Sequence, residues 1–158
     1  MTHTTPRRGL VLAAAALAFL PASGHAQARP ALRVFRTLGC SCCSAWAEHL
    51  RRAGFEIVLR DAADMAPIRT GASVPADLAG CHTGLLGKLV VEGHVPAAAL
   101  QRFLARPGGW RGLAVPGMPL GSPSMEIDGM APETYEVIAF AADGRREAFM
   151  RFRGAAPI

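Results

Sequence analysis

Three cysteines lie within the four residues 40–43, and a run that alternates apolar and basic residues over 32–36 precedes them. The alternation predicts a β-strand, and Gly39 predicts a turn directly after it. From 42 to 53 apolar residues recur at three- and four-residue spacing, which predicts a helix that ends before Gly54. The cysteines are therefore expected between a strand and the N-terminus of a helix, where free backbone amides and the helix dipole favour thiolates.

The rest of the chain alternates short predicted strands and helices. The predicted strands cover 55–59, 83–86, 89–91, 135–140 and 147–152, and the predicted helical segments cover 64–69, 75–79 and 96–105. We expect the last of these helices to bury Leu100, Phe103 and Leu104. Gly71 is expected to separate the two shorter helical segments.

The order of these segments predicts one α/β domain. A strand, a helix and a second strand of this length form a parallel crossover, and Gly87-Lys88 and Asp143-Gly144 predict tight antiparallel hairpins. Residues 107–133 form a long loop rich in glycine, proline and methionine, and loops of this length are usually functional or disordered. We therefore predict a thioredoxin/glutaredoxin-like βαβαββα core with a long Gly/Pro/Met loop and an added C-terminal β-hairpin.

The N-terminal segment is typical of an export signal. Arg7 and Arg8 precede an apolar run over 9–20, and small residues follow that run. We expect a secretory signal peptide over 1–26, with cleavage there or two residues later, and a single mature domain over 27–158. The arginine pair also weakly resembles a twin-arginine signal, which is the alternative export route.

Composition and charge exclude several other classes of protein. The chain is 51% hydrophobic and 18% charged, as globular domains are, and no apolar run reaches the roughly 18 residues of a membrane-spanning helix. Loss of the signal lowers the formal net charge from +5 to +3, and the remaining arginines are scattered, so we expect no nucleic-acid binding. No nucleophile elbow, phosphate loop or carboxylate pair supports hydrolase or nucleotide chemistry.

A fourth cysteine, Cys81, directly precedes a predicted strand and is followed by His82. In a thioredoxin-like layout this junction lies against the N-terminus of the first helix, so we expect Cys81 to join Cys40, Cys42 and Cys43. Zinc accepts four thiolates, but adjacent Cys42 and Cys43 fit a single tetrahedral ion poorly. Adjacent thiolates suit bridging between several soft ions, which favours Cu(I), while an iron–sulfur cluster is the alternative on ligand count.

Histidines and methionines supply weaker candidate ligands. His82 follows the fourth cysteine, His94 follows the predicted hairpin, and Met118 and Met125 lie in the long loop. Thioethers suit Cu(I), although methionine is also a common filler under irregular loops. We take these four residues as auxiliary metal ligands. His49 lies about 10 Å along the predicted helix from the cysteines, too far to share one ion with them.

Three functions are compatible with the cysteine cluster. The first is a copper-binding protein that sequesters Cu(I) and could also act as a copper oxidoreductase. The second is a thiol–disulfide oxidoreductase that uses Cys40 and Cys43, with Cys42 or Cys81 as the resolving thiol. The third is a protein in which two of the four cysteines form a structural disulfide and no ligand is bound.

Several linked motifs follow one another along the chain: the run Thr37–Leu50, Ala-Gly-Phe-Glu at 53–56, Cys-His-Thr at 81–83, Glu-Gly-His-Val-Pro at 92–96 and Val-Pro-Gly-Met-Pro at 115–119. Together these motifs resemble the CopG-like copper-resistance proteins of the bacterial periplasm. The resemblance covers nearly all of the mature chain. Ser41 and Ser124 stand at positions where the family usually has glycine.

The resemblance implies a thioredoxin-like fold, a periplasmic location and copper bound by Cys40, Cys42, Cys43 and Cys81. It also implies a role in copper handling or in Cu(I)/Cu(II) interconversion. The expected partners are copper ions and other periplasmic copper-handling proteins. We expect more than one Cu(I) ion at the site, and no membrane attachment once the signal is removed.

Overall fold

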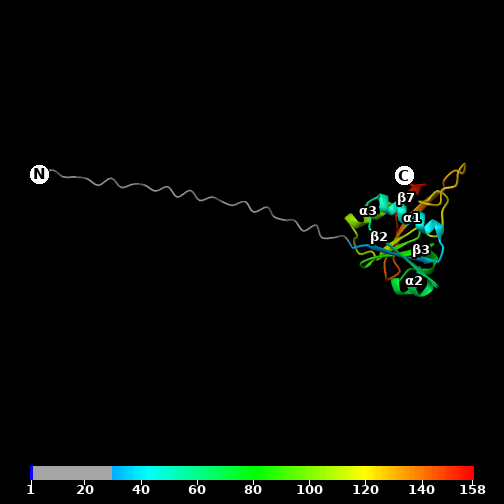
Figure 1. The fold of residues 1–158 in the computed structure, drawn as a ribbon, viewed down its shortest axis with the longest axis horizontal. Coiled ribbons are helices and arrows are strands. Elements are labelled where there is room, and N and C mark those ends of the chain that lie inside the picture. Colours follow the sequence, from blue (N-terminus) through cyan, green and yellow to red (C-terminus); the bar gives the residue numbers. More distant parts are fainter. Residues whose placement is uncertain (2–29) are drawn as a thin grey trace.

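The described part of the chain forms a mixed β-sheet of eight strands covered by three α-helices (Figure 1). The computed structural model describes residue 1 and residues 30–158, so the predicted signal peptide lies outside the described residues. The strands are β1 (Leu32–Thr37), β2 (Ile57–Ala62), β3 (His82–Leu86), β4 (Leu89–Glu92), β5 (Gly112–Ala114), β6 (Thr134–Phe140), β7 (Arg146–Arg153) and β8 (Ala156–Pro157). The helices are α1 (Ser41–Arg52), α2 (Ala66–Ala72) and α3 (Ala97–Ala105), with a short 3-10 helix, η1 (Ala76–Leu78), before β3.

The strand order in the sheet is β2-β1-β3-β4-β5-β6-β7-β8. β1 and β2 are parallel, as the predicted crossover requires, and β3 is antiparallel to both of its neighbours, β1 and β4. β4 and β5 are parallel, and the remaining pairs are antiparallel. The β3–β4 and β6–β7 hairpins confirm the turns predicted at Gly87-Lys88 and Asp143-Gly144, and the order of elements from β1 to α3 is the predicted one.

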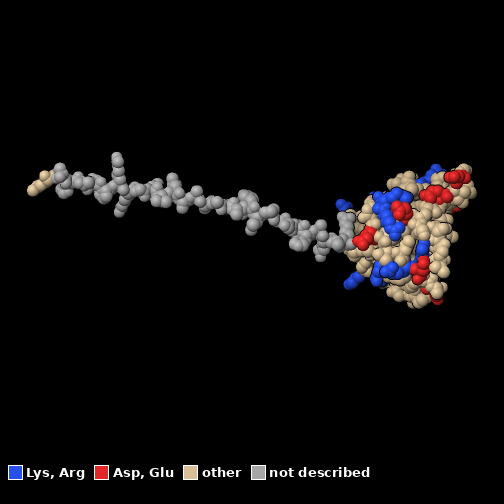
Figure 2. All heavy atoms as spheres, viewed as in Figure 1, with Lys and Arg blue, Asp and Glu red and all other residues tan. Residues whose placement is uncertain are grey.

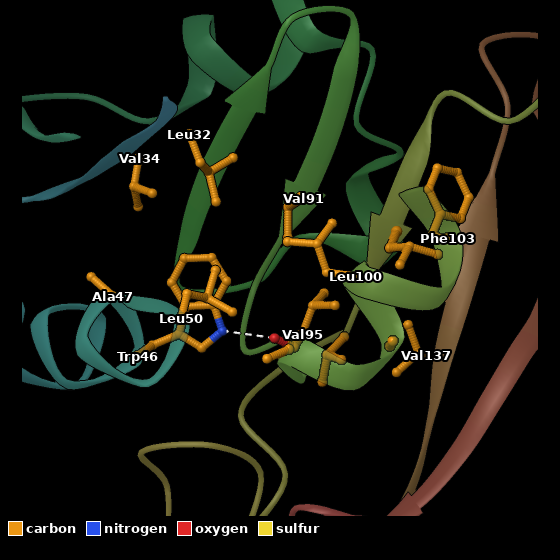
Figure 3. Close-up of a cluster of buried hydrophobic side chains, with 14 of the residues drawn as sticks. Leu32, Val34, Trp46, Ala47, Leu50, Val91, Val95, Leu100, Phe103 and Val137 are labelled. Atoms are coloured by element: carbon orange, nitrogen blue, oxygen red, sulfur yellow. Dashed lines mark hydrogen bonds between the residues drawn. The ribbon is translucent and has the colours of Figure 1, made fainter. Parts of the chain in front are cut away.

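The helices lie on both faces of the sheet, with α1 and α3 on one face and α2 on the other (Figure 1). On the first face, Trp46 and Leu50 of α1 and Leu100 of α3 pack with Val91 of the sheet (Figure 3). The Trp46 Nε1–H group donates a hydrogen bond to the carbonyl oxygen of Val95 at 2.9 Å. This bond joins α1 to the segment that leads into α3.

β2 begins at Ile57, two residues later than predicted, because the chain is still completing the end of α1. The Gly54 N–H group bonds to the Arg51 carbonyl at 2.9 Å, and the Phe55 N–H group reaches back to the Leu50 carbonyl at 3.1 Å. Gly54 has a φ of 88°, in the left-handed region that glycine adopts without strain. The predicted helix stop is therefore correct, and Gly54 and Phe55 both bond back to the end of the helix.

Residues 107–133 are not one continuous loop, because β5 lies within them and pairs with both β4 and β6. The segment 112–114 has no β-branched residue, so its own sequence gives little strand signal. The strand forms because its two neighbours supply hydrogen-bonding edges. Gly112 suits this position, since a Cβ there would collide with the carbonyl oxygen of Val90.

Two expectations about the helices are wrong. The two short helical segments separate at Ser73, which has a φ of 57°, whereas Gly71 lies inside α2. Leu104 is 41% exposed, while the other two apolar residues expected in the core of α3 are buried. Leu104 lies in the last turn of its helix, where it lines an open surface hollow with Phe55 and Leu86.

Within the described residues, no helix is long and apolar enough to cross a membrane.

Candidate metal centre

The N-terminal turn of α1 carries three of the four sulfur atoms. A turn at Gly39, with a φ of 78°, leads the chain from β1 into this helix. Cys40 is the N-cap residue, and its Sγ accepts a hydrogen bond from the Cys43 N–H group at 3.3 Å. Cys40 and Cys43 form a disulfide with their Cα atoms 5.4 Å apart, while Cys42 and Cys81 are free and partly exposed. Two cysteines are therefore paired and two carry thiols.

Cys81 directly precedes β3, whose first residue pairs with Arg36 near the end of β1. This pairing brings Cys81 to the end of the sheet at which α1 begins. The Cys81 Sγ atom lies 3.3 Å from the Sγ atoms of Cys40 and Cys43 and 3.4 Å from that of Cys42. All four sulfur atoms lie within 4.8 Å of one another. The antiparallel β1–β3 pair thus joins cysteines that are 41 residues apart in the chain.

The Cys81 thiol is held in its protonated form. Burial, followed by the hydrogen bond and charge of Cys42, raises the pKa of Cys81 to about 12. A thiolate rather than a thiol binds a metal, so binding at this sulfur releases a proton. The positive charge of Arg69 acts in the opposite direction but does not outweigh the burial of Cys81.

His82 is completely buried and has no hydrogen-bond partner on either ring nitrogen within the described structure. Its ring packs on the indole of Trp46, with ring centroids 4.1 Å apart, and meets the ring of His94 edge-on at 5.1 Å. Burial, and then the neighbouring His94, lowers the pKa of His82 well below its ordinary value, so the ring is neutral. A buried neutral imidazole with unpartnered nitrogens is free to bind a metal.

His94 is also buried, and only one of its ring nitrogens has a hydrogen-bond partner. Nδ1 lies 2.9 Å from the Pro123 carbonyl oxygen and 3.0 Å from the Ser124 hydroxyl, while Nε2 has no partner in the described structure. Donation from Nδ1–H to a carbonyl leaves the Nε2 lone pair available, as in many metal-binding histidines. Sulfur of Cys81 and one nitrogen each from His82 and His94 lie within 4.8 Å of one another.

The loop after β5 contacts the cysteine turn through Ser124. The Ser124 hydroxyl donates a hydrogen bond to the carbonyl oxygen of Cys42 at 2.9 Å. Met125, the next residue, is partly buried, whereas Met118 is 54% exposed at the turn that follows β5. His49 lies outside both groups of donor atoms, and its Nε2 accepts a hydrogen bond from the Ala97 N–H group at 3.1 Å.

Sequence reasoning missed the charged residues that support the cysteine segments. Arg36 donates hydrogen bonds to the Cys40 carbonyl at 3.0 Å and to Asp61 at 2.9 Å. The completely buried Glu92 forms an ion pair with Arg69 at 3.0 Å. The only sequence signal for Glu92 is an acidic residue that closes the otherwise apolar strand Leu-Val-Val-Glu, and the partner of such a residue is not visible in the sequence.

A family model described as "Protein of unknown function, DUF411" matches residues 78–125, which carry the fourth cysteine and both buried histidines. No curated protein matches the chain.

Two solved structures match most of the chain. A copper resistance protein CopG, form 1, is 36% identical with a TM-score of 0.74, and the match covers 80% of this chain and 99% of that one. Form 2 is also 36% identical, with a TM-score of 0.73, and the match covers 78% of this chain and 98% of that one. At this identity and coverage, the chain belongs to the CopG family of copper resistance proteins.

Proposed function

We propose that this chain is an exported, periplasmic copper-binding protein of copper resistance, and that Cys40, Cys42, Cys43 and Cys81 hold several Cu(I) ions. The observation that carries the proposal is the convergence of four sulfur atoms within 4.8 Å of one another. The two solved relatives are copper resistance proteins, which supports copper as the cargo.

The chemistry of the donors favours copper over zinc. Adjacent Cys42 and Cys43 cannot both point at one tetrahedral ion without strain, whereas bridging thiolates bind two or more low-coordinate Cu(I) ions. The cluster is partly exposed at three of its four cysteines, so ions can enter and leave from solvent. We therefore assign the four cysteines as the principal ligands.

The buried histidines extend the donor set. Three ring nitrogens of His82 and His94 are buried without a hydrogen-bond partner in the described structure. Each such group costs about 1–3 kcal/mol when it stays unpaired, and a bound ion would remove part of that cost. We propose His82 and His94 as auxiliary nitrogen ligands that share Cys81 with the thiolate site, and Met118 and Met125 as auxiliary thioether ligands.

The disulfide connects copper binding to redox chemistry. Two thiols can each give one electron to a Cu(II) ion, which yields two Cu(I) ions, one disulfide and two released protons. The Cys40–Cys43 disulfide has the oxidation state that such a step would give these two cysteines. Interconversion of Cu(II) and Cu(I) at this site is therefore part of the proposal, and an external dithiol must return the disulfide to thiols before the next cycle.

A second candidate function is thiol–disulfide exchange, and the same disulfide favours it. The free Cys81 sulfur lies 3.3 Å from both sulfur atoms of the Cys40–Cys43 pair, within reach for exchange. Exchange needs a thiolate, however, and burial raises the pKa of Cys81 to about 12. The copper-binding function is the better supported of the two.

The fold supports the proposal in one further respect. We propose that the unit from β1 to α3 is thioredoxin-like, because a parallel β1–α1–β2 crossover is followed by a helix, an antiparallel β3–β4 hairpin and a second helix. In that arrangement α1 begins next to the segment that enters β3. This arrangement places the three cysteines at the start of α1 next to Cys81, which directly precedes β3.

Counting copper ions tests the proposal. The exported protein is purified from the periplasm, reduced without oxygen and titrated with Cu(I) against a chromophoric chelator. We expect more than one tightly held ion per chain and the loss of this binding in Cys42→Ser. The matched control is Ser41→Ala, in the same helical turn but without a sulfur, and it should bind as the natural chain does.

Two kinds of result would contradict the proposal. One kind is a failure of copper binding, in which the natural chain holds no Cu(I) or holds a single ion that is still bound in Cys42→Ser. The other is efficient metal-free reduction of insulin by a chain that does not retain copper, which would favour thiol–disulfide exchange instead.

A further inference from the structure

We propose that Arg69 and Glu92 are positioning residues that hold the backbone before Cys81 and so keep the fourth sulfur at the other three. The inference rests on the proposed function for its copper readout only. Hydrogen bonds at Gly80, the residue immediately before Cys81, support this role.

Both backbone polar groups of Gly80 are bound by side chains. The Gly80 N–H group donates to Glu92 Oε1 at 2.8 Å, and the Gly80 carbonyl accepts from Arg69 Nη2 at 2.6 Å. Arg69 Nε also donates to the same carboxylate oxygen at 3.0 Å. Arg69 comes from α2 and Glu92 from the end of β4, so two elements remote in the sequence hold the two peptide units on either side of the Gly80 Cα atom.

Glu92 has no solvent contact, and its second oxygen is also bound. Oε2 accepts a hydrogen bond from the Thr83 hydroxyl at 2.6 Å. Thr83 lies in β3, the strand that directly follows Cys81. The carboxylate therefore contacts the chain on both sides of Cys81, at Gly80 and at Thr83. A buried ion pair is weak evidence for stability, because an apolar pair of similar volume often serves as well. Its contacts on both sides of one cysteine indicate a positional role.

Packing leaves Gly80 little room to move. A Cβ on Gly80 would lie 2.6 Å from the Cα atom of Gly93, and a Cβ on Gly93 would collide with the Val115 carbonyl oxygen. The Gly80 backbone is therefore in close contact with Gly93, the residue between Glu92 and His94. Metal sites require their ligands within about 0.5 Å of the productive position, and polar partners behind the ligands supply that precision.

The first test measures sulfur placement without copper. In a background with Cys40→Ser and Cys43→Ser, only Cys42 and Cys81 remain as thiols. Diamide oxidises such a pair to a disulfide and takes up the two electrons and two protons itself. The two sulfur atoms lie 3.4 Å apart, so oxidation is fast while the backbone holds them together, and Arg69→Lys, which keeps the charge that lowers the pKa of Cys81, separates placement from charge. We expect Arg69→Met to slow this oxidation at least about tenfold, by analogy with other losses of ligand support.

The second test measures Cu(I) affinity in the otherwise natural, reduced chain. We expect Arg69→Met to weaken binding by about ten- to a hundredfold, the range for loss of residues that orient metal ligands. Arg69→Lys should recover only part of the affinity, because an ammonium cannot contact Glu92 and the Gly80 carbonyl with the fork geometry of a guanidinium. If Arg69→Met does not fold, Glu92→Gln takes its place. We expect Glu92→Gln also to slow the oxidation and to weaken Cu(I) binding.

Arg111→Met is the matched control. Arg111 also joins two segments through backbone carbonyls, those of Ala72 at 3.3 Å and Lys88 at 2.5 Å, and one of them belongs to α2 as Arg69 does. This variant should retain the natural oxidation rate and Cu(I) affinity. Equal losses in Arg69→Met and Arg111→Met, or natural values in Arg69→Met, would overturn the proposal. A natural chain that binds no Cu(I) would contradict the proposed function, and the oxidation rates would then decide the positioning role alone.

Discussion

Ser124 shows how a single side chain connects the loop to the cysteine turn. Its φ of 72° lies in the left-handed region, which costs a non-glycine residue about 1–2 kcal/mol. Its hydroxyl offsets this cost, because it donates to the Cys42 carbonyl at 2.9 Å and lies 3.0 Å from His94 Nδ1. A serine therefore functions at a position whose backbone conformation favours glycine, and it adds contacts that glycine cannot make.

Two substitutions separate the strain at Ser124 from its hydrogen bonds. Ser124→Ala keeps the strain and loses the bonds, so we expect a loss of about 1 kcal/mol in the free energy of unfolding. Ser124→Gly loses the same bonds but relieves the strain, so it should be less destabilising than alanine. Urea unfolding of the reduced chain measures both values. A glycine variant less stable than the alanine variant would show that strain is not significant here.

Helices α1 and α3 are joined by side chains that cross between them. Trp46 of α1 bonds to the Val95 carbonyl just before α3 (Figure 3), and His49 accepts a hydrogen bond from Ala97, the first residue of α3. A helix N-terminus has unpaired N–H groups, and a side chain from a neighbouring helix satisfies one of them here. The two helices on this face of the sheet therefore form one layer whose stability depends on a neutral His49.

This contact makes stability depend on pH. Burial, and then the charge of Arg52, lowers the pKa of His49, with Glu126 acting in the opposite direction. Because the folded pKa is lower than that of the unfolded chain, about 6.5, the unfolded chain binds more protons between the two values. The contribution of His49 is therefore fully present above about pH 6.5 and is lost as the pH falls toward the folded pKa.

His49→Gln tests this contribution, because glutamine keeps a hydrogen-bond acceptor but does not titrate. We expect the metal-free variant to lose less unfolding free energy between pH 7.5 and pH 5 than the natural chain loses. Chemical unfolding at several pH values measures the difference. The buried His82 and His94 have pKa values shifted in the same direction, so some pH dependence remains in the variant. A pH profile identical to that of the natural chain would exclude a role for His49.

In the molecule as a whole, the sheet brings together donors from separate parts of the chain. β1 delivers the cysteine turn of α1, β3 delivers Cys81 and His82, and the segment after β4 delivers His94. The surface gives no such concentration of charge on the face shown in Figure 2, where basic and acidic side chains are interspersed. Among the described residues, the sulfur and nitrogen donor atoms therefore lie together at one end of the sheet. A ligand bound there would link several elements.

We therefore expect copper to stabilise the whole fold. If the reduced natural chain binds Cu(I) and its unfolded form does not, free Cu(I) at a thousandfold excess over Kd adds about 4 kcal/mol of stability. Thermal unfolding with and without Cu(I) measures the shift, and a strong chelator should reverse it. In Cys81→Ser most of the shift should disappear, because the remaining sulfurs all lie on one helical turn. An equal shift in that variant would show that copper binds without joining the two segments.

Local patterns in the sequence determined much of this structure. The alternation over 32–36, the helical spacing after the cysteines and the glycine that follows α1 predicted β1, α1 and its end, because each depends on neighbouring residues only. The turn residues of the two hairpins predicted antiparallel pairs for the same reason. The placement of three sulfurs at a helix N-terminus was likewise a local property, visible before any tertiary contact.

Tertiary contacts decided the rest. β5 exists because β4 and β6 provide edges on both sides, and the three residues Gly-Leu-Ala do not by themselves predict a strand. Glu92 accepts hydrogen bonds from Gly80 and from Arg69 of α2, so these contacts depend on where α2 lies against the sheet. The unpartnered nitrogens of His82 depend on its packing against Trp46. The sequence determined which donor atoms are present and which local elements carry them. The distances between the donor atoms, their hydrogen-bond partners and their burial came from pairings between remote segments. The packing and hydrogen-bond energies that fix these properties depend on neighbours that only the folded chain supplies.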